Sequence, residues 1–291
     1  MTIRTLAAPA KVNLHLGIYA ELDERAYHRA DSLMVALDLA DEVEVVLDKS
    51  LQEPSVVCEP EVHIPPQKNT AYRAAVALAE RYGKLPQAKI RIIKHVPDQA
   101  GLGGSSSDAA SVILCLCKLW GIDPEDPLVS EAARNVGADV PFFLDPVPTL
   151  LVGAGDVVKS KFPALETLIP VALVRPPGPG VSTPVAYAAF DEEHDDPADC
   201  QALYDVLASG NVTGAKIAPL LSNNLDPVAC RLLPADAEVR SWLLAQPGVL
   251  GGQVSGSGSC VFGICADDDA TRDVVLSALA HGWWAHAAHI V

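Results

Sequence analysis

Three features that would place this chain in a special class are absent from its sequence. No apolar run reaches the length of about 18 residues that a transmembrane helix needs. The N-terminus lacks a basic stretch followed by an apolar core, which excludes a typical signal peptide. Basic residues are scarce, because 21 Lys and Arg stand against 37 Asp and Glu and leave a net charge of −16. We therefore expect neither a membrane nor a nucleic acid as partner, since wrapping a phosphate backbone needs a basic face.

Cysteines are present, but they lack the paired spacing of a disulfide or metal framework. There are seven, an odd number. Cys115 and Cys117 stand two apart in an expected helix and so point to different sides. Cys260 and Cys265 would lie on opposite faces of a strand. We expect free thiols and a reducing, cytoplasmic location.

What remains is the composition of a globular enzyme. At 291 residues and 49% hydrophobic content, the chain can bury a large core as one large domain or two ordinary ones. A more polar stretch over 155–165 indicates a boundary, which we place between an N-terminal domain, 1–158, and a C-terminal domain, 159–291. No internal repeat or low-complexity segment interrupts either part.

The densest special chemistry lies in residues 97–111, which read PDQAGLGGSSSDAAS. Three glycines within 101–104, joined to three serines, allow several amide N–H groups to point into one concavity, and such a nest attracts an anion. The apolar stretch 109–120 predicts a buried helix, with one of the first two serines as its cap and Asp108 in its first turn. A glycine-rich loop that opens onto a helix N-terminus predicts a phosphate site.

This loop is neither of the two commonest nucleotide motifs. A P-loop requires a lysine after its glycines, and none follows them here. Ser106 stands where the dinucleotide fingerprint has its third glycine. The alternative is a glycine-rich turn that merely starts a core helix. The three serines and the small Ala109-Ala110 pair favour the phosphate site, because they let phosphate oxygens and a facing sheet come close.

The segment 5–19 alternates between apolar and other residues, which predicts a strand. Lys11 and Asn13 share the face opposite the apolar one. Solvent exposure is the ordinary state of a lysine on a strand, so the pattern alone leaves the role of Lys11 open. The polar loop that follows carries Tyr27 beside His28, a pair that can stack on and hydrogen-bond a flat heterocycle or can simply lie on the surface.

Asp139 stands between small and apolar residues just ahead of Pro141, an unusual setting for an acid. A buried aspartate must be paired or hydrogen-bonded, so we expect a lysine near it. The structural alternative is an aspartate that caps a helix. Residues 191–199 are acidic and predict a surface loop.

The remaining periodicities predict a mixed α+β protein. Asn69 or Thr70 can cap a helix over 71–82, which Gly83 ends. Further helices are expected over 126–135, 199–209, 235–245 and 271–281. Strands are expected over 32–39, 41–47, 88–96, 148–155, 170–174, 261–265 and 283–291, with a Pro/Gly-rich loop at 176–180.

Three separated motifs resemble those of the galacto-, homoserine-, mevalonate- and phosphomevalonate-kinase (GHMP) superfamily. They are PAKVNL at 9–14, GLGGSSSDAA at 101–110 and GSGSCVF at 256–262, and they occur in the order of that family. The resemblance spans nearly the whole chain. It implies a two-domain α+β GHMP kinase fold, in which an ATP-loop domain of ribosomal-protein-S5-like type precedes a ferredoxin-like domain. It also implies an active site in the cleft between these domains.

Further details resemble one branch of the superfamily. They are Tyr27-His28 followed by Asp31-Ser32-Leu33, GADVPFF at 137–143 and SNNL at 222–225. That branch implies ATP-dependent phosphorylation of the 2-hydroxyl of a cytidine diphosphate-linked methylerythritol in non-mevalonate isoprenoid precursor synthesis. ATP and Mg2+ would be the cofactors, and the chain would be a monomer or weak homodimer. Ala26 departs from the glycine that is usual before Tyr-His, and Ser105 from a common third glycine.

The resemblance also implies roles for individual residues. Asp139 would accept the proton of the attacking hydroxyl with Lys11 as its partner, and both would be catalytic. Lys94 and Asn69 match positions near the adenosine of ATP, and Ser106 and Ser107 would contact phosphate or magnesium. The implied ATP-binding set is Asn69, Lys94, Pro97, Gly101, Leu102, Gly103, Gly104, Ser105, Ser106 and Ser107. The implied substrate-binding set is Asn13, Tyr27, His28, Thr183 and Tyr187, with Tyr27 stacking on cytosine, His28 hydrogen-bonding it and Tyr187 closing on it.

Two alternatives remain at this point. Another GHMP small-molecule kinase, of homoserine or mevalonate type, would show no dependence on a cytidine group. A nucleotide-binding regulator that kept the fold would lack the chemistry, but the presence of both Lys11 and Asp139 counts against it.

Overall fold

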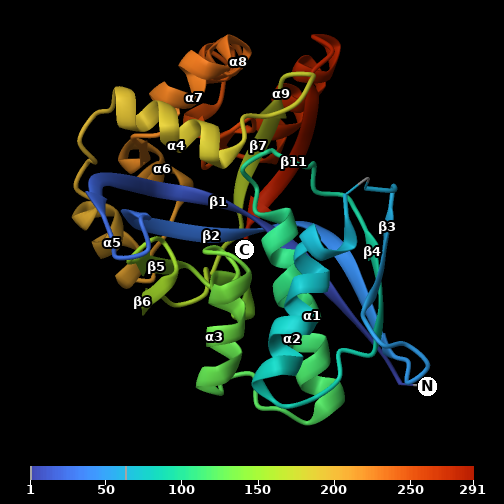
Figure 1. The fold of residues 1–291 in the computed structure, drawn as a ribbon. Helices are drawn as coiled ribbons and strands as arrows, with labels where there is room; N and C mark the ends of the chain where they lie inside the picture. Colours follow the sequence, from blue (N-terminus) through green and yellow to red (C-terminus); the bar gives the residue numbers. More distant parts are fainter. Residues whose placement is uncertain (1, 63) are drawn as a thin grey trace. The chain divides into compact units, whose positions relative to one another are not determined.

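The two longest strands are β1 (Ile3–Leu22) and β2 (His28–Leu47), of 20 residues each, and each contributes residues to both of the compact units described below (Figure 1). The computed structural model describes residues 2–62 and 64–291. The chain divides into two compact units. Unit 1 holds the residues up to Ala10 together with 39–97 and 103–146, and unit 2 holds 11–38, 98–102 and 147–291.

Unit 1 combines a small sheet with packed helices. Strand β4 (Ala88–Ile93) pairs in parallel with β3 (Ser55–Glu59) and antiparallel with residues 42–47 of β2. Helix α1 (Thr70–Arg81) packs against both α2 (Gly104–Trp120) and α3 (Pro127–Val136). Alanines and a leucine recur at helical spacing on the buried face of α1, which lets its neighbours approach closely. Two short 3-10 helices, η1 (Pro66–Lys68) and η2 (Phe142–Leu144), complete the unit.

Unit 2 contains an antiparallel run of strands in the order β11 (Trp284–Ile290), β7 (Ile169–Arg175), β10 (Val261–Cys265) and β9 (Val249–Val254). Helices α8 (Pro234–Leu244) and α9 (Asp268–Ala280) pack against these strands. A core of small and branched apolar side chains, such as Val174, Val239 and Val261, fills the space between helices and strands. All five residues of β10 are buried, as expected for a central strand.

The rest of unit 2 is built around the inner parts of β1 and β2. Strand β5 (Thr149–Val152) pairs antiparallel with β2 and with β6 (Val157–Lys161), and the two-residue β8 (Ser222–Asn223) pairs in parallel with β1. The helices of this part are α4 (Thr183–Glu192), α5 (Gln201–Ala208), α6 (Gly214–Ile217), η3 (Ala218–Leu220) and α7 (Asp226–Leu232).

The structure confirms the mixed α and β class and most of the expected elements. It adds elements that were not expected, among them β3, β6, β8, β9, α6 and α7, and differs in three further ways. The two strands expected at 32–39 and 41–47 form the single strand β2. Helix α4 was not expected, because a Pro/Gly-rich loop precedes it and Pro184 lies within it. Proline is compatible with the first turn of a helix, where its missing N–H would have no partner. The acidic surface loop expected from residue 191 therefore begins inside the last turn of α4.

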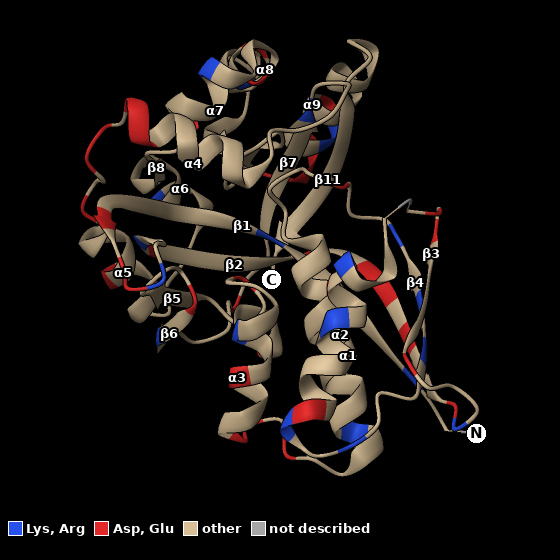
Figure 2. Cartoon of the chain, viewed as in Figure 1, with Lys and Arg blue, Asp and Glu red and all other residues tan. Residues whose placement is uncertain are grey.

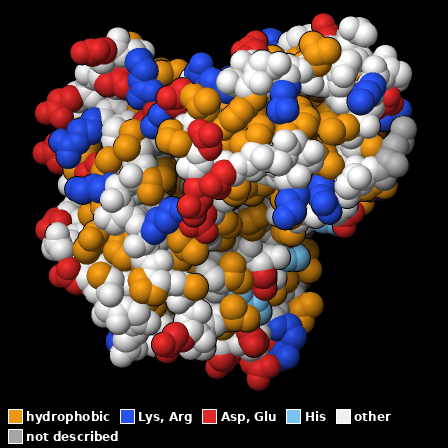
Figure 3. Space-filling model, turned by 90° about the horizontal axis from the view of Figure 1, so that it is seen from below, with side chains coloured by type: hydrophobic (Ala, Val, Ile, Leu, Met, Phe, Trp, Pro, Cys, Tyr) orange, Lys and Arg blue, Asp and Glu red, His pale blue; other side chains and the backbone are white. Residues whose placement is uncertain are grey.

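Charged side chains of both signs are spread along the strands of unit 1, whereas the C-terminal end of α4 is acidic (Figure 2). On the face drawn in Figure 3, acidic and basic side chains lie among apolar ones. All seven cysteines are free thiols. Within the described residues, no helix is both long and apolar enough to cross a membrane.

Candidate functional site

The first part of the glycine loop, residues 99–102, is tied to unit 2 through its carbonyl oxygens. All four accept a hydrogen bond, so the path of this segment is fixed. In order, the donors are the Ser259 N–H (3.3 Å), the Cys260 N–H (3.1 Å), the Ser255 hydroxyl (2.9 Å) and the Lys11 N–H (2.9 Å). Gly101 has φ +72°, and a Cβ there would lie 1.9 Å from the Ser255 carbonyl oxygen, so only glycine fits.

The second part of the loop starts α2 in unit 1. Gly103 is the N-cap residue, with φ +72°, and no side chain caps the helix, so the expected serine cap is wrong. The N–H groups of Ser106 and Ser107 instead bond to the Gly103 carbonyl oxygen (3.0 and 2.9 Å). Asp108 lies beyond the first turn, which corrects the other expectation for this helix. An uncapped helix N-terminus is a favourable place for a phosphate group.

Lys94 lies beneath the start of α2 and forms ion pairs with Asp41 of β2 and Asp108 of α2, the latter at 2.7 Å. Its side chain is only 8% exposed. Burial alone would lower the pKa of Lys94, but the two carboxylates outweigh burial and raise it. Burial raises the pKa of Asp108 to about 7, against the opposing effect of Lys94. Asp41 also accepts a hydrogen bond from the Val96 N–H (2.8 Å), so the cluster fixes the chain entering the loop.

Asn69 caps α1 as expected, because its side-chain oxygen accepts a hydrogen bond from the Ala71 N–H (2.9 Å). The next residue, Thr70, donates through its hydroxyl to the Ser105 carbonyl oxygen (2.7 Å). The starts of α1 and α2 are thereby linked. Unit 1 thus brings Asn69, Lys94 and the three serines of the loop into one neighbourhood.

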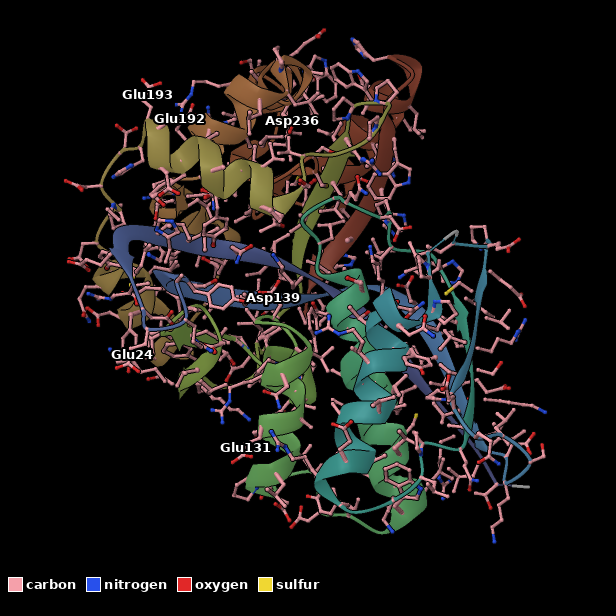
Figure 4. The ribbon with its side chains drawn as sticks, in the orientation of Figure 1. Glu24, Glu131, Asp139, Glu192, Glu193 and Asp236 are labelled. Atoms are coloured by element: carbon pink, nitrogen blue, oxygen red, sulfur yellow. The ribbon has the colours of Figure 1, made fainter. Side chains whose placement is uncertain are left out.

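Asp139 lies in the turn between α3 and η2 (Figure 4). It is half-buried, so the expected buried aspartate is corrected to a partly accessible one. Its turn begins beside α2, because a Cβ on Gly137 would lie 4.0 Å from the Ser106 hydroxyl oxygen. Ser106 is half-buried, whereas Ser107 is fully buried and its hydroxyl has no partner among the described residues. The turn that carries the partly accessible Asp139 therefore begins near the Ser106 hydroxyl, in the first turn of α2.

Lys11 and Asn13 share one face of β1, as the alternation predicted, but the ordinary exposed state is wrong for this lysine. Lys11 is 3% and Asn13 1% exposed. The Lys11 ammonium donates to the Asn13 side-chain oxygen (2.6 Å), and the Asn13 amide donates to the Ser32 hydroxyl (2.8 Å). His15, next on this face, contacts the Ser222 hydroxyl (2.7 Å), and burial lowers its pKa against the opposing effects of acidic neighbours.

His28 lies in an aromatic cluster of unit 2. It is 8% exposed, and its ring centroid lies 5.5 Å from that of Tyr187 and 5.6 Å from that of Phe190. Its Nδ1 lies 2.8 Å from the Tyr19 carbonyl oxygen. Because a carbonyl only accepts hydrogen bonds, Nδ1 donates to it, and Nε2, 3.1 Å from a carboxylate oxygen of Asp191, is the end directed at other groups.

Tyr27 differs from its neighbour, because 60% of it is exposed. Its N–H donates to the Asp23 carboxylate (3.0 Å), and the guanidinium of Arg25 lies 5.4 Å from its ring centroid. The turn passes through Ala26 at φ +61°, a left-handed conformation that disfavours a Cβ. The glycine usual at this position in the resembling branch is thereby explained.

Thr183 and Tyr187 stand one turn apart on α4 and so share a face of the helix. The Thr183 hydroxyl lies 3.4 Å from that of Ser257 in the third glycine motif. Tyr187 is half-buried beside His28. Unit 2 therefore brings together both predicted substrate residues of α4, the aromatic cluster and the third motif.

Several residues of these neighbourhoods were not predicted. Asp41 had a signal in the sequence, because an acid in the middle of an apolar strand pattern needs a partner. Tyr19, Phe190 and Asp191 had none, since their contacts with His28 join segments far apart in the sequence. Ser32 stood in a motif of the resemblance, but its bond to Asn13 could not be read from it.

Comparison with protein families identifies both glycine-rich regions. Residues 69–145 match the GHMP kinases N terminal domain and residues 211–283 the GHMP kinases C terminal domain. The boundary placed after residue 158 stays a prediction.

Curated relatives match nearly the whole chain. The 4-diphosphocytidyl-2-C-methyl-D-erythritol kinase of Geobacter sp. (strain M21) is 36% identical, with 98% of each chain covered. The enzyme of the same name from Paramagnetospirillum magneticum is 33% identical over the full length of both chains.

Solved structures agree with these relatives. A crystal structure of 4-(cytidine 5'-diphospho)-2C-methyl-D-erythritol kinase superposes with a TM-score of 0.76 at 33% identity, covering 98% of each chain. A homoserine kinase from Cytophaga hutchinsonii superposes with a TM-score of 0.74 at 18% identity, covering all of this chain and 95% of its own, and shares the fold. The predicted resemblance and fold are confirmed: the chain belongs to the GHMP kinases and, within them, to the family of 4-diphosphocytidyl-2-C-methyl-D-erythritol kinases.

Proposed function

We propose that this protein transfers the γ-phosphoryl group of ATP to the 2-hydroxyl of 4-diphosphocytidyl-2-C-methyl-D-erythritol, in isoprenoid precursor synthesis. The observation that carries the choice of substrate is the aromatic cluster of His28, Tyr187 and Phe190 in unit 2. A flat, partly accessible ring beside a histidine of fixed orientation is suited to a pyrimidine base. Full-length relatedness to kinases named for this substrate supports the same choice.

The orientation of His28 suits recognition of a base. With Nδ1 donating to the Tyr19 carbonyl, Nε2 is the ring nitrogen that would hydrogen-bond cytosine, in place of its present neighbour, the Asp191 carboxylate. Tyr187 provides a face on which the base stacks, and the exposed Tyr27 provides another. Thr183 and Asn13 complete the substrate-binding set that we propose.

The triphosphate would bind at the start of α2. Its uncapped N-terminus attracts anions, while the bonded carbonyl oxygens of 99–102 are turned toward the protein and away from a ligand. Asn69 and Lys94 would stand near the adenosine, as the family resemblance implies. We assign the phosphate contacts to the backbone of 101–105 and to Ser106, whose hydroxyl is half-buried rather than sealed.

Lys11 and Asp139 would carry the chemistry. Asp139 would accept the proton of the attacking hydroxyl, and the Lys11 ammonium, oriented by Asn13, would offset negative charge at the transferred group. Phosphoryl transfer asks a protein mainly for positioning and charge neutralisation. A lysine, one carboxylate and a helix N-terminus meet that requirement.

The donor set of unit 1 fits Mg2+, which prefers hard oxygen ligands and is usually held by one or two carboxylates together with phosphates and water. Among the described residues no cluster of three acidic, His or Cys side chains is present, so a site built mainly of protein ligands is not formed. Asp139 and Ser106 would hold the ion with the phosphates of ATP. When bound, it would neutralise phosphate charge.

Turnover with Mg2+ and ATP tests the substrate. The cytidine-linked methylerythritol is compared with homoserine and mevalonate at equal concentration. We expect turnover with the first alone. Turnover with another alcohol would keep the kinase and remove the cytosine roles of Tyr27, His28 and Tyr187.

Asp139→Asn tests the proposed base, with Glu131→Gln as the control, at a partly exposed residue of α3 that pairs with Arg81 (Figure 4). We expect D139N to lose at least about 100-fold in kcat, because general base catalysis contributes factors of that order, while ATP binding and Tm stay near those of the unchanged protein. E131Q should keep full turnover. A large fall in Tm with D139N would instead make Asp139 a structural residue.

A cytoplasmic location completes the proposal, and fractionation of the producing cells checks it.

A further inference from the structure

The segment Ser222–Leu225 has no role in the function proposed above, although the side chain of Asn223 makes three hydrogen bonds. Asn223 is 8% exposed. Its amide nitrogen donates to the carbonyl oxygens of Val254 and Gly256, both at 2.9 Å. Its side-chain oxygen accepts a hydrogen bond from the Leu225 N–H (2.9 Å). One side chain thus holds two carbonyls on either side of Ser255.

The backbone that Asn223 holds packs against the catalytic lysine. A Cβ on Gly256, which has φ +58°, would lie 3.5 Å from the Lys11 ammonium nitrogen, 3.7 Å from the Asn13 side-chain oxygen and 3.6 Å from the Gly101 carbonyl oxygen. Ser255, between the two held carbonyls, donates its hydroxyl to that same Gly101 oxygen (2.9 Å). Movement of residues 254–256 would therefore disturb both the lysine and the glycine loop.

We propose that Asn223 is a positioning residue for phosphoryl transfer, acting through Ser255 and Gly256 on Lys11 and on the loop at Gly101. The inference rests on the proposed function of those two elements. Asn223 reaches neither of them directly. By fixing two carbonyls, Asn223 holds the backbone of Gly256, which packs against the Lys11–Asn13 pair. It also holds Ser255, whose hydroxyl bonds to the Gly101 carbonyl oxygen of the glycine loop.

The next residue provides a matched control. Asn224 also makes three hydrogen bonds: its oxygen accepts from the Ile18 N–H (2.9 Å), and its amide donates to the Ile18 and Asp195 carbonyl oxygens (2.8 and 2.9 Å). These bonds hold the far end of β1, where Ile18 packs in the same core cluster as Phe190. Asn224 therefore supports the substrate pocket rather than the lysine and the loop.

The experiment compares Asn223→Ala with Asn224→Ala, both measured well below their Tm. We expect N223A to lose at least about tenfold in kcat, the equivalent of about 1.4 kcal/mol, with KM for the cytidine substrate within about twofold. N224A should raise that KM and leave kcat within about threefold. Equal losses of kcat in the two variants, or a loss in N223A that disappears on cooling, would overturn the proposal.

Asn223→Asp adds a readout that a merely structural role would not change. At neutral pH the carboxylate of N223D accepts but cannot donate, so both carbonyls lose their partner. Burial raises the pKa of such a carboxyl, and protonation restores one donor, so the ratio of kcat in N223D to kcat in N223A should rise as pH falls from about 7 to about 5. A ratio independent of pH, with both variants impaired only in Tm, would contradict a positioning role.

Equilibrium binding of a fluorescent ATP analogue separates this inference from the proposed substrate. N223A should weaken binding at least about fivefold, whereas N224A should leave it unchanged, because only Asn223 supports the loop at Gly101. This measurement needs no acceptor alcohol. If the unchanged protein phosphorylates none of the alcohols tested, the substrate proposal fails, and the binding comparison still decides the role of Asn223.

Discussion

Asp236 should make a contribution to stability that falls as pH rises, and Asp236→Asn should remove that contribution. The side chain stands on α8 (Figure 4), is 0% exposed, and neither carboxyl oxygen has a hydrogen-bond partner among the described residues. Burial and then the neighbouring carboxylate of Asp226 raise its pKa to about 7, with Arg175 opposing them. A Cβ on Gly258 of the third motif would lie 2.8 Å from its Oδ2, so the carboxyl lies directly under that loop.

The sign and size of the effect follow from linkage. In the unfolded chain Asp236 loses its proton near pH 4, whereas the folded protein keeps it to about pH 7. Between these values the folded state binds more protons, so each pH unit removes about 1.4 kcal/mol from the free energy of unfolding. The complete penalty is about 4 kcal/mol, reached above about pH 7.

Urea unfolding of D236N and the unchanged protein at four values between about pH 5 and about pH 8 measures this effect. The difference in unfolding free energy should grow by about 2–3 kcal/mol from about pH 5 to about pH 7 and then level off, because an amide does not ionise. Asp196→Asn, at an exposed position, is the control and should show no such growth. A difference between D236N and the unchanged protein that is constant with pH would refute the reasoning.

Three further predictions concern backbone strain and buried charge. Ala26→Gly should raise unfolding free energy by up to about 1 kcal/mol, because φ is +61° there, and a fall in Tm would contradict it. Gly101→Ala should abolish binding of a fluorescent ATP analogue, since its Cβ would lie 1.9 Å from a carbonyl oxygen. The control is Gly83→Ala, at a residue with φ +60° but no atom within 4 Å of the added Cβ. It should lower the free energy of unfolding in urea by only about 1–2 kcal/mol and leave binding of the analogue intact. Lys94→Met should lower the free energy of unfolding by about 3–5 kcal/mol at neutral pH, because it leaves two buried carboxyl groups without their cation. An unchanged midpoint of urea unfolding would show that the two ion pairs contribute nothing to stability.

The sequence by itself determined the features that depend on residues close together in the chain. Alternation placed Lys11 and Asn13 on one face of β1, because successive strand side chains point to opposite faces. Asn69 was recognisable as a cap, since capping needs only the next two residues. The glycine loop before α2 and the two other motifs pointed to the family because each is a short run of adjacent residues that can be read directly from the sequence.

Tertiary structure alone decided which side chains are buried and what they meet. Lys94 pairs with Asp41, 53 residues away, and Asn223 reaches Gly256, 33 residues away, so no local pattern contained these contacts. The half-burial of Asp139, the cluster around His28 and the Asp236 carboxyl, which has no hydrogen-bond partner in the described part of the chain, also depend on how distant segments pack. Local sequence sets which backbone conformations are available, whereas packing of distant segments sets the solvation and charge around each group, and these govern its chemistry.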